Sequence, residues 1–461
     1  MQAVLLKTDV LFFVLLVAGG LYAWQARRHA HLRAPWRQVA RRPLGMAAAV
    51  VLSAYVAIAL LDSVHFRQTG ADSGGELLSA FDLLVTPLRT QVERTYSAPL
   101  AAEAYTREVV ELTDGTTARD FPRLVHGGAH LRDPDSERGA DIAARLVAGV
   151  LGGAAAVAVL TVLVIVTLAR RRRERPSEVA LRLSRGESEF PWRSVLGTLL
   201  VLALFAGCGV QLADGYHVLG TDQVGNDVLY QALKSIRTGL LIGTLTTLVM
   251  LPFAVAFGLA AGYFGGWVDD VIQYLYTTLS SIPGVLLVAA SVLVLEIHMG
   301  KHADDYSSLA ARADLRLLAL CFILGVTAWT GLCRYLRGEA LKLRSADFIL
   351  AARAFGVSHP GILARHVLPN IMHIVMITIV LDFSGLVLAE AVLTYIDIGV
   401  DPSMESWGNM INGARLELAR EPMVWWSLSA AFVFMFALVL AANVFADAVR
   451  DAFDPRLRDL R

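Results

Sequence analysis

The chain has 461 residues, of which 56% are hydrophobic and 18% are charged, and its mean hydropathy is +0.54. Soluble domains carry about 25% charged residues, so these values exclude an ordinary soluble enzyme and indicate a polytopic membrane protein. The formal net charge is zero, which excludes the overall basic bias of a nucleic-acid-binding protein.

Nine apolar runs follow one another along the chain. Each is close to the 17–25 residues that a helix needs to cross the hydrocarbon core of a bilayer. We therefore predict an all-α, polytopic integral membrane protein with about nine transmembrane helices. Pro252 and Pro283 fall inside two of the runs, and we expect each proline to kink its helix. The runs lie at about 9–26, 44–61, 145–169, 194–213, 236–262, 271–297, 315–336, 371–395 and 423–448.

The first run is short enough to be a signal peptide, but its flanks favour a retained helix. Only Lys7 precedes it, whereas six arginines follow it by position 42. Short arginine-rich loops stay in the cytoplasm, and the arginines of 170–175 and 337–365 reach the same side if all nine runs cross. We expect the N-terminus outside, the C-terminus in the cytoplasm, and residues 62–144 outside.

The segment expected outside has two parts. Leucines and valines recur at roughly helical spacing over about 76–112, which predicts amphipathic helices lying over the membrane. Residues 127–141 are rich in glycine and charge and are typical of a loop.

The stretch at about 340–370 is polar, although two apolar runs flank it. We predict a short helix capped by Ser345 or Asp347 and ended by Gly356, because glycine adopts a left-handed conformation at low cost. Ser358 and Pro360 predict the start of a second short helix, and Pro369 should interrupt the chain before the next span. A helix, a tight turn and a helix form a shape for docking a partner.

Two ionisable residues, Asp382 and Glu390, lie inside the run at 371–395. A charged group at the centre of a membrane helix costs about 2.5–3.5 kcal/mol on insertion scales, so such groups face protein or water. Eight positions place them roughly 80° apart around a helix. Two roles stay open for them, a structural contact between helices and the lining of a substrate path.

The polar stretch resembles the cytoplasmic EAA loop of ABC-importer permeases. The family pattern is Glu-Ala-Ala, three residues, Gly, nine residues, an apolar residue, one more, then Leu-Pro. Leu350 replaces the glutamate and His366 the apolar residue. The resemblance implies that the loop couples the permease to an ATPase through Ala351, Ala352, Arg353, Gly356, Val357, Leu368 and Pro369.

Further stretches are similar to the C-type permease of dipeptide and oligopeptide importers, and they occur in the family's order. They lie at 219–243, 261–270 and 388–411, followed by a tail at 447–458. The resemblance covers about 191–461 and implies a type I ABC-importer permease core with six transmembrane helices. Residues 1–190 are then an N-terminal extension with three transmembrane helices. We expect this extension to be separable from the core.

The chain contains no GxxxxGK[ST] phosphate loop, so we expect no enzyme activity, cofactor or metal site in it. The resemblance implies partners: a second, B-type permease, two ATP-binding cassette subunits that bind ATP and Mg, an extracytoplasmic solute-binding protein, and the lipid of a bacterial inner membrane. The exported segment could cap the translocation entrance, contact the solute-binding protein or pack against the extra spans.

The function implied is a permease subunit of a peptide importer. Within transport, nickel chelates, glutathione or antibiotic peptides are alternative substrates, because such importers share this pattern. A membrane scaffold or sensor that retains the permease fold without transport is the alternative from another class.

Overall fold

The computed structural model describes residues 2–28, 30–67, 77–111, 117–302 and 308–453. The chain forms two compact units, and each contains residues from both sides of the boundary expected near residue 190. Unit 1 comprises Met1–Val4, Arg37–Arg237 and Glu405–Ala441, and unit 2 comprises Leu5–Trp36, Thr238–Met404 and Ala442–Arg461. Part of the expected tail, from residue 454 on, lies outside the described residues.

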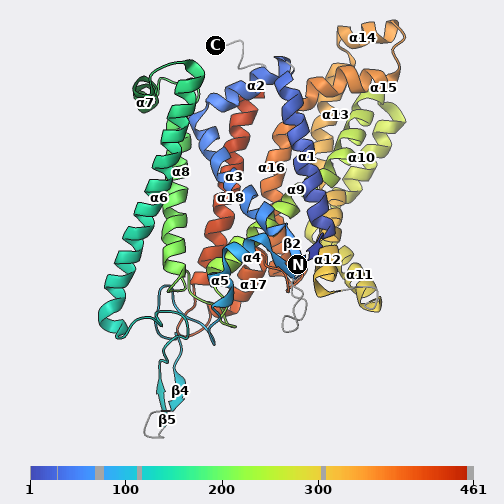
Figure 1. The fold of residues 1–461 in the computed structure, drawn as a ribbon. Coiled ribbons are helices and arrows are strands. Elements are labelled where there is room, and N and C mark those ends of the chain that lie inside the picture. The colour runs from blue at the N-terminus through green and yellow to red at the C-terminus, as the bar shows by residue number, and fades with distance from the viewer. Residues whose placement is uncertain (1, 29, 68–76, 112–116, 303–307, 454–461) are drawn as a thin grey trace. The chain divides into compact units, whose positions relative to one another are not determined.

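Unit 1 contains the long apolar helices α3, α6 and α8 (Figure 1), together with the first part of α9 and of α18. Two small antiparallel sheets accompany them, one formed by β1, β2 and β3 and the other by β4 and β5. The elements of unit 1 are β1 Gln2–Val4, the end of α2 Ala30–Arg41, α3 Pro43–Asp62, β2 His65–Arg67, β3 Leu77–Ser79, α4 Ala80–Leu84, α5 Thr86–Thr90, β4 Glu108–Glu111, β5 Thr117–Asp120, α6 Pro134–Arg172, α7 Pro176–Arg185, α8 Trp192–Ala213, α9 Val228–Phe264, α17 Trp407–Glu417 and α18 Trp426–Phe453.

Unit 2 is almost entirely helical. It begins with α1 and includes the remainder of α9 and the end of α18. Its described residues contain a single π-helical segment. Its elements are α1 Lys7–Arg28, α10 Gly266–Ser281, α11 Gly284–Lys301, α12 Leu309–Ala328, α13 Thr330–Arg344, α14 Asp347–Ala354, α15 His359–Ile362, the π-helix η2 Leu363–Val367 and α16 Leu368–Tyr395.

The prediction of about nine transmembrane helices is confirmed. Nine helical segments within the described residues are long and apolar enough to cross a membrane. They are Lys7–Gln25, Pro43–Asp62, Pro134–Arg172, Trp192–Ala213, Val228–Phe264, Gly284–Lys301, Leu309–Arg344, His359–Tyr395 and Trp426–Phe453.

One predicted run is divided in the structure. The run at 271–297 contains the end of α10 and most of α11, because Ile282 is extended (φ −91°, ψ 130°) and Pro283 precedes α11. Proline disfavours the helical conformation of the residue before it, so Pro283 ends a helix and does not merely kink one. Pro252, in contrast, lies within the continuous helix α9.

The segment expected outside, at 62–144, also differs from the prediction. The amphipathic helices expected over 76–112 are wrong, since the described part of this stretch, residues 77–111, contains only the five-residue helices α4 and α5, the strands β3 and β4, and irregular chain. Such helices are too short to be stable by themselves. The segment is held by side-chain contacts described below.

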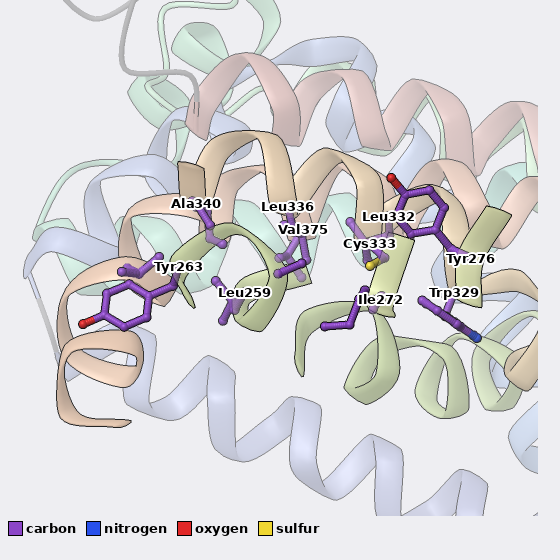
Figure 2. Close-up of a cluster of buried hydrophobic side chains, with 14 of the residues drawn as sticks. Leu259, Tyr263, Ile272, Tyr276, Trp329, Leu332, Cys333, Leu336, Ala340 and Val375 are labelled. Carbon is purple, nitrogen blue, oxygen red and sulfur yellow. The ribbon is translucent and has the colours of Figure 1, made fainter. Parts of the chain in front are cut away.

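The core of unit 2 lies where α9, α10, α13 and α16 meet (Figure 2). Packing there is close: a Cβ atom added at Gly262 would lie 2.6 Å from Cβ of Ala340. Small residues of this kind let membrane helices pack closely. Close packing is important for helix association in a membrane, because lipid supplies no hydrophobic driving force. The residues labelled in Figure 2 are Leu259, Tyr263, Ile272, Tyr276, Trp329, Leu332, Cys333, Leu336, Ala340 and Val375.

Candidate functional site

The predicted coupling helix is present as α14. It begins after Ala346, and neither Ser345 nor Asp347 caps it, so that detail of the prediction is wrong. Gly356 follows the helix with φ +76°, as predicted for its end. The N–H of Gly356 donates to the carbonyl of Arg353 (3.0 Å) and the N–H of Val357 to that of Ala352 (3.1 Å), which satisfies carbonyls at the end of the helix.

The second short helix begins at the predicted place and then continues. Ser358 occupies the N-cap position without a side-chain hydrogen bond, and Pro360 lies in the first turn of α15. The expected interruption at Pro369 is wrong, because the π-helix η2 connects α15 directly to α16, with Pro369 in its first turn. A π-helical turn widens the helix locally and accommodates the missing proline N–H.

One face of this loop is anchored to the end of α9. The hydroxyl of Tyr263 lies 2.8 Å from Nδ1 of His359, and Nε of Arg353 donates to it over 3.2 Å. The Arg353 guanidinium also lies 4.7 Å from the centre of the Tyr263 ring, a cation–π distance. Ile349 and Ile362 are completely buried in the core of unit 2.

The other face of the loop is open. Leu350 and Ala351 are exposed, and Phe355 is 87% exposed. Ala352 is buried, so only one of the two predicted alanines, Ala351, belongs to the open face of α14. Leu368 and Pro369 belong to the start of α16, where they continue the loop into the next span.

An ion pair joins α10 to α13, the helix that precedes this loop. Arg337 donates to both carboxylate oxygens of Asp269, over 2.5 and 2.7 Å. These hydrogen bonds hold the pKa of Asp269 below its ordinary value. Sequence reasoning did not single out Tyr263 or Asp269 as functional, although both lie in the family-like stretch 261–270.

The two ionisable residues of α16 have different environments in the structure. Glu390 is 1% exposed and accepts a hydrogen bond from the Thr394 hydroxyl (2.8 Å). Asp382 is half-buried, and none of the described residues forms a hydrogen bond or ion pair with its carboxylate. Glu390 is therefore hydrogen-bonded within the protein, whereas Asp382 has no such partner among the described residues.

Unit 1 contains a buried charged cluster that sequence reasoning missed. Nδ1 of His217 lies 2.8 Å from the Asp227 carboxylate and Nε2 lies 3.4 Å from that of Glu93. The Glu93 carboxylate also accepts the N–H groups of Val125, His126 and Gly127 over 2.7–3.0 Å. We call Glu93, His217 and Asp227 the outer cluster.

Burial and hydrogen bonding oppose each other in this cluster. Burial favours the neutral forms and raises the pKa of Glu93, but hydrogen bonds from His217 and the three N–H groups lower it to about 2. Burial likewise lowers the pKa of His217, but its bonds to Asp227 and Glu93 raise it to about 9. The imidazolium of His217 and the carboxylate of Glu93 are therefore both charged at neutral pH.

A second buried network joins the segment expected outside to α9. Nζ of Lys234 donates to both oxygens of Asp82 (2.7 and 2.8 Å), and the Tyr230 hydroxyl donates to the same carboxylate (2.8 Å). Asp62, the last residue of α3, lies 3.8 Å from Nζ. Asp82 also closes a capping box with Ser79 at the start of α4.

These contacts show where the segment expected outside packs. Glu93 and Asp82 belong to the extension, whereas His217 and Lys234 lie beyond residue 190. Further along, the hydroxyl of Tyr105 donates to the carbonyl of Met423 (3.0 Å). The segment is attached to the helix α9 and to loops of the region that resembles the permease core, as well as to the extra span α3.

Comparison with known proteins gives one family match and several similar permeases. The family described as binding-protein-dependent transport system inner membrane component matches residues 254–459. The dipeptide transport system permease protein DppC of Lactococcus lactis subsp. cremoris is 31% identical over 248 residues, which are 54% of this chain and 66% of that protein. The oligopeptide transport system permease protein OppC of Mycobacterium tuberculosis is 31% identical over 245 residues, or 53% and 78% of the two chains. The glutathione transport system permease protein GsiD of Pectobacterium atrosepticum is 30% identical over 242 residues, or 52% and 73%.

Proposed function

The chain belongs to the family of inner-membrane components of binding-protein-dependent transport systems, and on this premise we propose that it is a permease subunit of an ATP-driven importer of peptides. Relatives are named as dipeptide, oligopeptide and glutathione permeases, which supports a peptide-like substrate. The chain itself has the long apolar helices of a membrane protein.

The observation that carries the mechanism is the two-faced loop at α14 and α15. Its inner face is fixed to Tyr263 and to the core of unit 2, while Leu350, Phe355 and Val357 remain exposed on its outer face. An exposed aromatic side chain on a rigidly anchored helix is suited to a protein contact. We infer that an ATPase subunit binds this face and that α13 and α16 pass its movement into the membrane.

The partners follow from the family. We propose a second, B-type permease, two ATPase subunits that bind ATP and Mg, and an extracytoplasmic solute-binding protein. Of the two ionisable residues in α16, we assign Asp382 to the substrate path, because its carboxylate has no partner among the described residues. We assign Glu390 a structural role, because it is buried and hydrogen-bonded.

Substitution of Gly356 tests the coupling. A valine at φ +76° is strained even though no atom lies within 4 Å of the added Cβ, because β-branched residues strongly disfavour the left-handed region. In a complex reconstituted in liposomes, Gly356→Val should leave ATP hydrolysis largely intact and abolish most ATP-dependent uptake of labelled peptide. Gly331→Val is the matched control, because Gly331 lies in the helix α13 with equally open space. Normal uptake by the Gly356→Val complex would overturn the assignment of this loop.

One departure supports the alternative of a scaffold or sensor that does not transport. Leu350 occupies the position of the family's glutamate in the coupling loop. Genes for a B-type permease, ATPases and a solute-binding protein beside the gene for this chain would favour transport, and their absence would favour the scaffold. A screen of peptides, glutathione, nickel chelates and antibiotic peptides against the purified solute-binding protein would then identify the substrate.

A further inference from the structure

A dense group of arginines surrounds the amphipathic helix α7 in the N-terminal extension. Eight arginines and four glutamates occur between positions 170 and 193. Three of the arginines form the last turn of α6, and Arg173 ends that helix in a left-handed conformation (φ 56°). We use the name arginine collar for the exposed side chains of Arg170, Arg171, Arg172, Arg173, Arg175, Arg185 and Arg193.

The collar is electrostatically unbalanced. Glu174 pairs with Arg182 (3.2 Å), and Glu189 pairs with Arg37 (2.7 Å) and Arg41 (3.2 Å). These three arginines all lie outside the collar. Within the part of the chain that the structure describes, none of the seven collar arginines forms an ion pair. The nearby glutamates therefore leave a net excess of positive charge exposed at this site.

The collar is held rigidly at a membrane boundary. Val179 and Leu183, on one face of α7, pack against Ala169 and Trp192 at the ends of α6 and α8. Figure 1 shows α6 and α8 side by side, with α7 beside the end of α6. Both long helices are transmembrane segments that reach this end of unit 1, and tryptophan is typical of the bilayer interface. The arginines therefore lie at the level of lipid headgroups.

We propose that the arginine collar binds the headgroups of anionic phospholipids in the adjacent leaflet. The guanidinium group is planar and can donate two parallel hydrogen bonds to a phosphate. Each basic residue near an anionic bilayer surface strengthens binding by about fivefold. Because α7 is fixed to α6 and α8, little conformational freedom is lost when these arginines bind lipid. This binding is independent of the proposed transport function.

The test compares lipid retention by the full-length purified protein and its variants. The first variant replaces three collar arginines with glutamine (Arg171→Gln, Arg173→Gln and Arg185→Gln). The segment keeps enough positive charge to preserve the membrane topology. Labelling of a cysteine added by Ser136→Cys verifies that topology. The protein is incorporated into nanodiscs of phosphatidylcholine with phosphatidylglycerol, and retained lipids are counted by native mass spectrometry. We expect the triple variant to lose its preference for phosphatidylglycerol by more than tenfold, and 0.5 M salt to weaken that of the original protein.

Two control variants accompany the triple glutamine variant. Lysine at the same three positions should retain most of the preference, because the charge is kept. Glutamine at Arg132 and Arg138, which are exposed near the opposite end of α6, should change nothing. Unchanged retention in the triple glutamine variant would overturn the proposal. The proposal would also be overturned if 10 mM inorganic phosphate stabilised the protein as much as the lipid does. The same holds if the triple glutamine variant lost a co-purified ATPase subunit but retained its lipid.

Discussion

At the scale of single residues, the outer cluster shows how much stability a few buried charges control. His217 is 1% exposed and lies between the carboxylates of Glu93 and Asp227. A buried ion pair contributes little compared with well-packed apolar residues, but removal of one member leaves a buried charge without compensation. The packing of the segment that contains Glu93 therefore depends on the charge of His217, and it should depend on pH.

The sign of that dependence follows from the two pKa shifts. The folded pKa of His217 is about 9 against an ordinary value of 6.5, so its contribution is complete below pH 6.5 and is lost as pH rises through 9. The folded pKa of Glu93 is about 2 against 4.5, so its contribution is complete above pH 4.5 and is lost as pH falls through 2. The His217 shift corresponds to roughly 3 kcal/mol.

We predict that the melting temperature of the detergent-solubilised protein decreases between pH 6.5 and 9. His217→Gln should lower the melting temperature at pH 6 and should flatten its decrease at higher pH, because the titrating group is gone. His126→Gln is the control, since only the backbone N–H of His126 bonds to Glu93. Parallel pH profiles for the original protein and His217→Gln, measured by scanning fluorimetry, would contradict the role given to the cluster.

Asp314 has a similar role in unit 2, where it holds the first helix of the extension. Its buried carboxylate accepts the N–H groups of Lys7 (2.9 Å) and Thr8 (3.4 Å), and also the Thr8 hydroxyl. We predict that Asp314→Ala destabilises the protein by roughly 1–3 kcal/mol, because buried donors lose their acceptor. Asp314→Asn should cost less, since the amide oxygen can still cap α1. Equal denaturation midpoints for the two variants would refute this explanation.

At the scale of elements, the pairing of α6 with α8 depends on glycine. A Cβ atom at Gly149 would lie 2.6 Å from Cα of Cys208, and one at Gly153 would lie 2.5 Å from the carbonyl oxygen of Ala203. Gly152, between them, has no atom within 4 Å of such a Cβ. The spacing of Gly149 and Gly153 is the small-xxx-small pattern that lets membrane helices approach closely.

This geometry makes a prediction with a control one residue away. Gly153→Leu should separate α6 from α8 and lower the melting temperature by several degrees, because the leucine collides with the backbone of α8. Gly152→Leu should have little effect, since its side chain points into open space. Equal melting temperatures for the two leucine variants would show that the helices do not pack through this face.

The elements also show what the sequence could and could not predict. The spans were predictable because bilayer thickness imposes a local requirement on length and apolarity. The turn at Gly356 was predictable because a single residue carries the left-handed conformation. The anchor of the α14–α15 loop was not, because Tyr263 lies 96 residues from His359, and a contact at that separation has no local signal. The segment at 76–112 was misread because its leucine spacing resembles a helix, whereas contacts to distant residues such as His217 determine its structure.

At the scale of the whole molecule, the extension is tied into both compact units. Glu93 and Asp82 connect it to residues of unit 1 beyond position 190, and Thr8 connects it to Asp314 in unit 2. We have proposed that residues 1–190 are an added module, and their removal should therefore lower the stability of the remaining chain. A chain that begins near Ser188 should still insert and co-purify with its partner permease, but with a lower melting temperature. Failure to co-purify once inserted would show that the extension is required for assembly.

The orientation of the chain is the property on which the proposed ATPase contact depends. The arginines that follow the first span, those of 170–175 and those of 337–365 share the cytoplasmic face only if all nine spans cross and the N-terminus lies outside. An eight-span arrangement would leave one of these groups outside. The structure also limits which positions can report the orientation, because Thr8 is completely buried whereas Leu5 is 67% exposed.

We therefore predict the labelling pattern of single cysteines at Leu5, Ser136 and Ser358, all of which are exposed. Each is introduced into a chain in which the native cysteines Cys208, Cys321 and Cys333 are replaced by alanine. An impermeant maleimide applied to intact spheroplasts should label positions 5 and 136 and should reach position 358 only after the membrane is permeabilised. Labelling of position 358 in intact cells would place α14 and α15 outside, where no ATPase could bind them. If position 5 were labelled only after permeabilisation, the first span would have the opposite orientation and fewer segments would cross the membrane. The two readouts therefore test the proposed coupling loop and the extension separately.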